Sequence, residues 1–165
     1  MPPFFIGVSR AAGMDTATLI EMLCVLFLLA SGVFVVYYDL RFNSIPNWIT
    51  YAGILLGFVL VVFFRRGDLM NYVAAFLVGG GVFYAMFLCG WFGGGDVKLV
   101  AMIGLLMGSR FLLDAVVYMT VAGGLVACCY VVEHLLRRKP LRGAKIPYGT
   151  AIMAGTYYAI YQGIA

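Results

Sequence analysis

Two aspartates, Asp39 and Asp96, each stand at the end of an apolar segment. An ionisable side chain at membrane depth is costly unless it has a partner or a function. Two carboxyl groups held close together cannot both ionise easily, so such a pair shares a proton. An aspartic protease uses this state, because the ionised carboxylate takes a proton from water while the protonated one polarises the scissile carbonyl. The alternative is that each aspartate only caps a helix end at the interface.

The residues around Asp96 favour a site for a polypeptide. Gly93, Gly94 and Gly95 precede this aspartate, and Lys98 follows it two residues later. Glycine leaves the backbone open to close approach, and an unwound substrate helix needs partners for its freed backbone groups. We therefore expect a glycine-lined, locally irregular segment beside Asp96. Lys98 either pairs with a carboxylate and lowers its pKa or extends toward the lipid headgroups.

The elements that carry these residues are predicted to be membrane helices. Hydrophobic residues make up 64% of the 165 residues and charged ones 11%, with a mean hydropathy of +1.03. Soluble domains have about 45–50% apolar and about 25% charged residues, so an ordinary water-soluble domain is excluded. At about 20 residues per span, the chain has room for about six spans. We predict an all-α, polytopic membrane protein in which residues 1–165 form a single transmembrane domain.

The expected spans follow the apolar runs 18–38, 48–64, 72–91, 97–107, 115–136 and 146–164. Pro46 suits the first turn of the second helix. The fourth span is the shortest, since Arg110 and Asp114 bound it early, and we expect Asp114 to lie in a connection, as Asp15 and Asp68 do.

Counting these crossings brings the two aspartates to one membrane face. Two spans separate Asp39 from Asp96, and two more return the chain to that face before Pro147. The connection there carries five basic residues, which mark it as cytoplasmic by the positive-inside rule: Arg137, Arg138, Lys139, Arg142 and Lys145. Arg65, Arg66 and Arg110 fall on the opposite side. On this parity both termini lie outside.

Histidine and cysteine usage argues against other kinds of site. The chain has one histidine, His134, which makes a histidine-based metal site or a Ser-His-Asp triad a poor hypothesis. Its four cysteines form no C-x-x-C pair, so neither a zinc ribbon nor a disulfide framework is supported. We predict no metal, no cofactor and no nucleic-acid partner.

Three stretches together resemble the type IV prepilin peptidases, a family of GxGD intramembrane aspartyl proteases. The first is Asp39-Leu40-Arg41 followed by Ile45-Pro46-Asn47. The second runs from Gly93 through Asp96 and Lys98 to Leu99 and is similar to the family's GxGDxK motif. The third, at the start of the last span, is Ile146-Pro147-Tyr148-Gly149.

The resemblance implies a catalytic pair, Asp39 and Asp96, and supporting residues that shape the site: Gly93, Gly95, Lys98, Pro46, Asn47, Pro147 and Tyr148. It implies an aspartic-type endopeptidase in the bacterial inner membrane. Its active site would face the cytoplasm, where it would remove basic leader peptides from prepilins and pilin-like proteins. Membrane lipid, a second copy of the chain and the pilus-assembly machinery are the other expected partners.

Larger bifunctional members of that family carry a cytoplasmic insertion with paired C-x-x-C zinc ligands, whereas here residues 41–44 fill the comparable space. The chain therefore resembles the short, tight-adherence (Flp pilus) type, and an archaeal preflagellin-type peptidase is a nearby alternative. N-methylation of the mature pilin, with its S-adenosylmethionine cofactor, is not predicted. From another class, the acidic pair is also compatible with a non-enzymatic transporter or assembly subunit that binds cations or protons.

Overall fold

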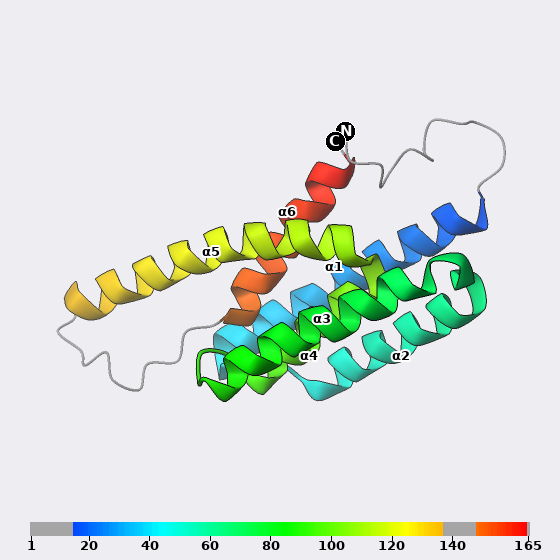
Figure 1. Cartoon of the computed structure of the whole chain (residues 1–165). Coiled ribbons are helices and arrows are strands. Elements are labelled where there is room, and N and C mark those ends of the chain that lie inside the picture. Colours follow the sequence, from blue (N-terminus) through cyan, green and yellow to red (C-terminus); the bar gives the residue numbers. More distant parts are fainter. Residues whose placement is uncertain (1–14, 137–147, 165) are drawn as a thin grey trace.

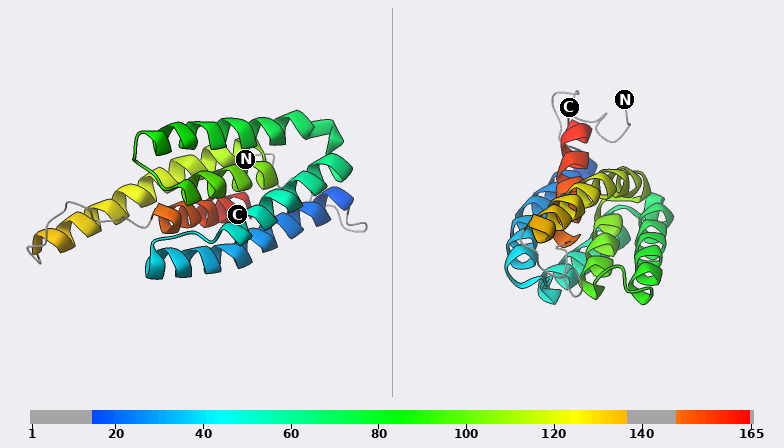
Figure 2. Two further views of the ribbon diagram at one scale, coloured as in Figure 1. Left: turned by 90° about the horizontal axis from the view of Figure 1, so that it is seen from below. Right: turned by 90° about the vertical axis from the view of Figure 1, so that its left-hand side faces the viewer.

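The computed structural model describes residues 15–136 and 148–164. These residues form six α-helices and a short 3-10 helix, and no strand occurs among them: α1 (Thr16–Phe42), α2 (Asn47–Phe64), η2 (Arg66–Asp68), α3 (Leu69–Leu88), α4 (Gly94–Met107), α5 (Ser109–Leu136) and α6 (Tyr148–Ile164). The all-α prediction is confirmed. Figures 1 and 2 show the helices gathered into one bundle, with the far end of α5 extending beyond its neighbours.

Four stretches are long and apolar enough to cross a membrane: 16–42, 47–64, 66–88 and 109–129. They correspond to the predicted first, second, third and fifth spans. The other two predicted spans are shorter helices, since α4 has 14 residues and the described α6 has 17. The structure therefore supports a polytopic membrane protein with six helices, four of which meet these criteria for a span.

The short helix α4 lies at the centre of the bundle and positions Asp96. It contacts each of the other five α-helices, and its residues from Leu99 to Met107 are all buried. The outer helices instead expose large apolar side chains, for example Leu26, Leu55 and Leu125. Such exposure suits lipid rather than water. A buried central helix with apolar outer helices around it can carry a carboxyl group that lipid does not reach.

The junction between α4 and α5 differs from the prediction. Gly108 ends α4 with a positive φ of +85°, a backbone conformation that glycine tolerates. The next helix starts at once at Ser109, whose backbone N–H donates to the side-chain oxygen of Asn71 at 3.3 Å. Arg110 and Asp114 therefore lie within the first turns of α5, and the expectation of a connection at Asp114 was wrong.

Candidate active site

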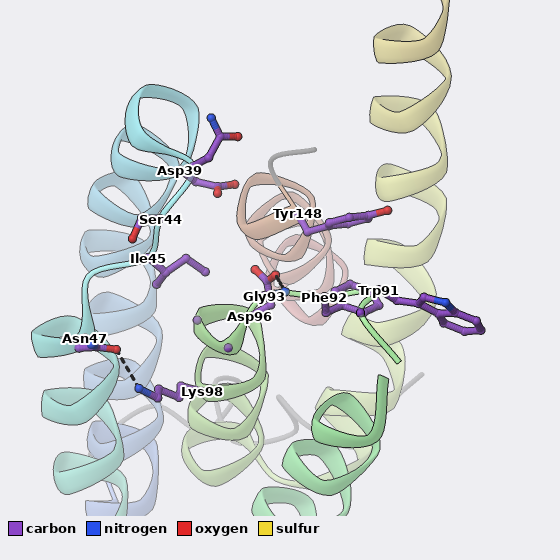
Figure 3. Close-up of a pocket in the computed structure, with 14 residues that line it drawn as sticks. Asp39, Ser44, Ile45, Asn47, Trp91, Phe92, Gly93, Asp96, Lys98 and Tyr148 are labelled. Atoms are coloured by element: carbon purple, nitrogen blue, oxygen red, sulfur yellow. Dashed lines mark hydrogen bonds between the residues drawn. The ribbon is translucent and has the colours of Figure 1, made fainter. Parts of the chain in front are cut away.

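A pocket of about 820 Å³ opens at the end of the bundle where α1 finishes and α4 and α6 begin. Its lining comes from five segments far apart in the sequence, namely the last turn of α1, the connection 43–46, the start of α2, residues 90–98 and the start of α6. Figure 3 shows Asp39 and Asp96 reaching toward the same space from α1 and α4, with Tyr148 of α6 beside it. The arrangement brings both predicted carboxylates together.

Asp39 lies in the last turn of α1 and is only 5% exposed. Its Oδ2 accepts two hydrogen bonds from Thr150, one from the backbone N–H at 2.7 Å and one from the hydroxyl at 3.1 Å. Thr150 is in the first turn of α6, where backbone N–H groups have no partner within the helix. The start of α6 therefore holds this carboxyl group in place.

Asp96 is the third residue of α4 and is 7% exposed. Its Oδ2 accepts a hydrogen bond from the backbone N–H of Gly93 at 2.9 Å, so its side chain caps its own helix. Burial raises the pKa of Asp96 from 3.8 to about 6; the Gly93 hydrogen bond opposes this rise, and the nearby charge of Asp39 adds to it. Asp96 can therefore carry a proton up to about pH 6, and a coupled pair of carboxyl groups can share such a proton.

The irregular segment expected beside Asp96 lies earlier in the chain than predicted. Gly94 and Gly95 form the regular first turn of α4, because the side chain of Asp96 satisfies the free N–H group at the helix start. The non-helical stretch instead comprises residues 89–93, in which Gly90 has φ +78°. This stretch lines the pocket, so glycine-rich irregular backbone still borders the site.

Ile45 is a buried side chain of the α1–α2 connection that fills the space between α4 and α6. A β-carbon on Gly95 would lie 2.9 Å from Ile45 Cβ, and one on Gly149 would lie 2.9 Å from Ile45 Cδ1. A side chain at either position would therefore push Ile45 away. Two glycines thus allow this loop to pack beside the carboxyl groups.

Among the residues that the structure describes, no carboxylate pairs with Lys98. Its Nζ donates to Oδ1 of Asn47 at 2.9 Å and lies 4.8 Å from the ring centroid of Tyr51. Both partners belong to α2, and Pro46 is the N-cap of that helix. Lys98 and Asn47 line the pocket, whereas Pro46 acts through the start of α2. This neutral amide partner was not among the predicted alternatives for Lys98, which were a carboxylate partner or the lipid headgroups.

Tyr148 lines the pocket at the start of α6 and packs on Phe92, with the ring centroids 4.8 Å apart. Figure 3 shows the Tyr148 and Phe92 side chains on the same side of Asp96, with Trp91 pointing away. Pro147 and the predicted basic connection lie outside the described residues. An aromatic wall therefore closes one side of the pocket.

A sequence model of the type IV leader peptidase family matches residues 17–128, a stretch that includes both aspartates. The chain belongs to this family. It is 29% identical, over 161 residues, to the prepilin leader peptidase/N-methyltransferase of Bacillus subtilis (strain 168). The alignment covers 93% of the chain but 61% of that relative, so the chain spans about three fifths of the relative's length. No solved structure matches the chain.

Other charged side chains of this leader peptidase family member gather at the opposite end of the bundle. There a second pocket of about 690 Å³ is lined by residues that include Glu21, Asp68, Arg110 and Asp114. Arg65, also at this end, donates to the backbone carbonyl of Leu106 at 2.8 Å. These groups are separated from Asp39 and Asp96 by the buried length of α4.

Sequence reasoning assigned no role to Thr150, Ile45 and Phe92. Thr150 directly follows the Pro-Tyr-Gly stretch. A hydroxyl residue in the first turn of a helix, where backbone N–H groups are also free, could have indicated a partner for a carboxylate. Ile45 stood within a quoted motif without a role. No local pattern points to Phe92, because its contact with Tyr148 depends on how the helices pack.

Proposed function

We propose that the chain is an aspartic-type endopeptidase that removes leader peptides from type IV prepilins and pilin-like proteins. The observation that carries the proposal is the meeting of two buried carboxyl groups, Asp39 and Asp96, in one open pocket. A pair that shares one proton holds a base for water and an acid for the scissile carbonyl. Membership of the leader peptidase family supports the same activity.

We further propose that the substrates are Flp-like prepilins and that no methyl group is transferred. The printed name of the Bacillus subtilis relative joins peptidase and N-methyltransferase activities in that protein. In this chain the connection between α1 and α2 is short, residues 43–46. It leaves no room for an inserted zinc-binding module at that position.

The active site is proposed to face the cytoplasm of a bacterial inner membrane. The basic residues of segment 137–145 directly precede α6, whose first residue lines the pocket. Cys89 offers a test, because it is exposed and adjoins the pocket-lining Gly90. A membrane-impermeant maleimide should label Cys89 in inverted vesicles and not in intact cells, with Cys89→Ser identifying the labelled site. Labelling in intact cells would contradict this orientation.

The activity is tested with purified protein in detergent and a full-length Flp-type prepilin. Wild-type protein should release the leader, whereas Asp39→Asn and Asp96→Asn should not. Asp68→Asn is the matched control, since Asp68 is exposed in η2 at the other end of the bundle. The transporter alternative would be favoured if well-folded wild-type protein left the prepilin intact and bound ions in a pH-dependent way.

A further inference from the structure

Asp39 and Asp96 differ in the hydrogen bonds that they accept. Thr150 donates to Asp39 Oδ2 twice, from its backbone N–H at 2.7 Å and from its hydroxyl at 3.1 Å. Asp96 Oδ2 accepts one hydrogen bond, from the backbone N–H of Gly93 at 2.9 Å. Donors that point at a carboxylate stabilise its ionised form, because a protonated carboxyl group has less acceptor capacity to offer them.

The two environments therefore divide the roles. We propose that Thr150 is a positioning residue that keeps Asp39 ionised and oriented, so that Asp39 takes the proton of the attacking water while Asp96 protonates the scissile carbonyl oxygen. This inference rests on the proposed peptidase function. The raised pKa of Asp96, about 6, is consistent with its carrying the shared proton.

The steps balance. Asp39 removes a proton from water as the water oxygen bonds to the carbonyl carbon, and the displaced carbonyl electron pair takes the proton of Asp96. This gives a gem-diol, a protonated Asp39 and an ionised Asp96. Asp39 then gives its proton to the amide nitrogen, and Asp96 removes a hydroxyl proton as the C–N bond breaks. The products are a carboxylic acid and an amine, and both aspartates return to their starting states.

Within residues 15–136 and 148–164, few other titratable groups face Asp39. α1 packs against α2, α4 and α6, and the titratable residues that line the pocket besides Asp39 are Asp96 and Lys98 on α4 and Tyr148 on α6. Lys98 donates to Asn47. On its own helix, Arg41 lies two residues from Asp39 and is exposed. The hydroxyl of Thr150 is therefore a direct and removable influence on Asp39.

The test is the pH profile of kcat/KM for prepilin cleavage by wild type, Thr150→Val and Thr150→Ser. The acid limb reports the base, and the alkaline limb reports the acid. Thr150→Val removes the hydroxyl but keeps the backbone donor, so the acid limb should move to higher pH by about one unit. The alkaline limb should stay in place, and Thr150→Ser should restore the wild-type profile.

Thr156→Val is the matched control, because Thr156 is buried on the same helix and its hydroxyl donates to the carbonyl of Ile152 at 2.8 Å. It should leave both limbs unmoved. If Thr150→Val moves the alkaline limb instead, the two roles are reversed. If it lowers the rate without moving either limb, Thr150 has only a structural role. Either outcome overturns the inference.

A second measurement does not depend on cleavage. Infrared titration in an Asp96→Asn background, with the Asp39→Asn/Asp96→Asn protein as the blank, isolates the carboxylate band of Asp39. Adding Thr150→Val should move the appearance of that band to higher pH by about one unit, and adding Thr150→Ser should not. Superimposable titrations would contradict the role of Thr150. A shifted titration without any cleavage by wild type would instead refute the peptidase function.

Discussion

Gly149 lies against the carboxyl group of Asp39. A β-carbon built on Gly149 would be 3.1 Å from both Cγ and Oδ2 of Asp39, which is closer than such atoms normally approach. The next residue, Thr150, donates to the same oxygen. The first turn of α6 is therefore fitted to one carboxylate, with a glycine for the close approach and donors to hold it.

Gly149→Ala should displace Asp39 by a few tenths of an ångström while the helices still assemble. Small misplacements of reacting groups lower the reaction rate strongly, so we expect kcat for prepilin cleavage to fall by about tenfold or more. Gly81→Ala is the control, because nothing lies within 4 Å of a β-carbon at that site in α3. A wild-type rate for Gly149→Ala would show that the position of Asp39 tolerates this contact.

Lys98 should affect cleavage through Asn47 rather than through the aspartates. Removing the 2.9 Å hydrogen bond in Lys98→Met should lower kcat/KM by about fivefold, the equivalent of about 1 kcal/mol. Asn47→Ala should have a similar effect, and the double variant should be no worse than Lys98→Met alone. Complete loss of cleavage in Lys98→Met, at the level of the aspartate variants, would mean that Lys98 acts on the carboxylates directly.

Asp96 should make stability depend on pH. Its folded pKa of about 6 exceeds the usual 3.8, so folding favours the protonated form. Below about pH 4, Asp96 is protonated in both the folded and the unfolded protein, so its ionisation does not lower the free energy of unfolding. The protein loses stability as the pH rises through about 6, and above that pH the free energy of unfolding is lower by about 3 kcal/mol. Asp96→Asn removes this cost while retaining an acceptor for Gly93.

The unfolding temperature in detergent measures this effect. Asp96→Asn should unfold at a higher temperature than wild type at pH 8, and the difference should disappear at pH 4. Asp68→Asn, at an exposed carboxyl group, is the control. An equal difference at both pH values would show that the substitution acts through packing rather than through ionisation.

Much of the site follows from counting helices. Asp39 and Asp96 stand two apolar runs apart, and two helices that cross the bundle in opposite directions return the chain to one end. The first turn after Pro147 reaches the same pocket. Apolar runs and their separators are local features, so the sequence is sufficient to predict these relationships. The catalytic roles of the two aspartates remain predictions.

Other features depend on packing that no local pattern encodes. The junction after α4 was misplaced because the charges of Arg110 and Asp114 resemble a loop, whereas Gly108 alone turns the chain. The partner of Lys98 lies 51 residues away, and the partner of Asp39 lies 111 residues away. Hydrogen bonds between such distant residues depend on how the helices pack against each other.

Mass spectrometry of a co-expressed Flp-type prepilin tests most directly whether Asp39 and Asp96 act together in cleavage. With the wild-type protein, the pilin should lose its leader and gain no methyl group at the new N-terminus. With Asp39→Asn or Asp96→Asn, present in the membrane at the wild-type level, the pilin should keep its full mass. A shortened pilin in either variant would contradict the account.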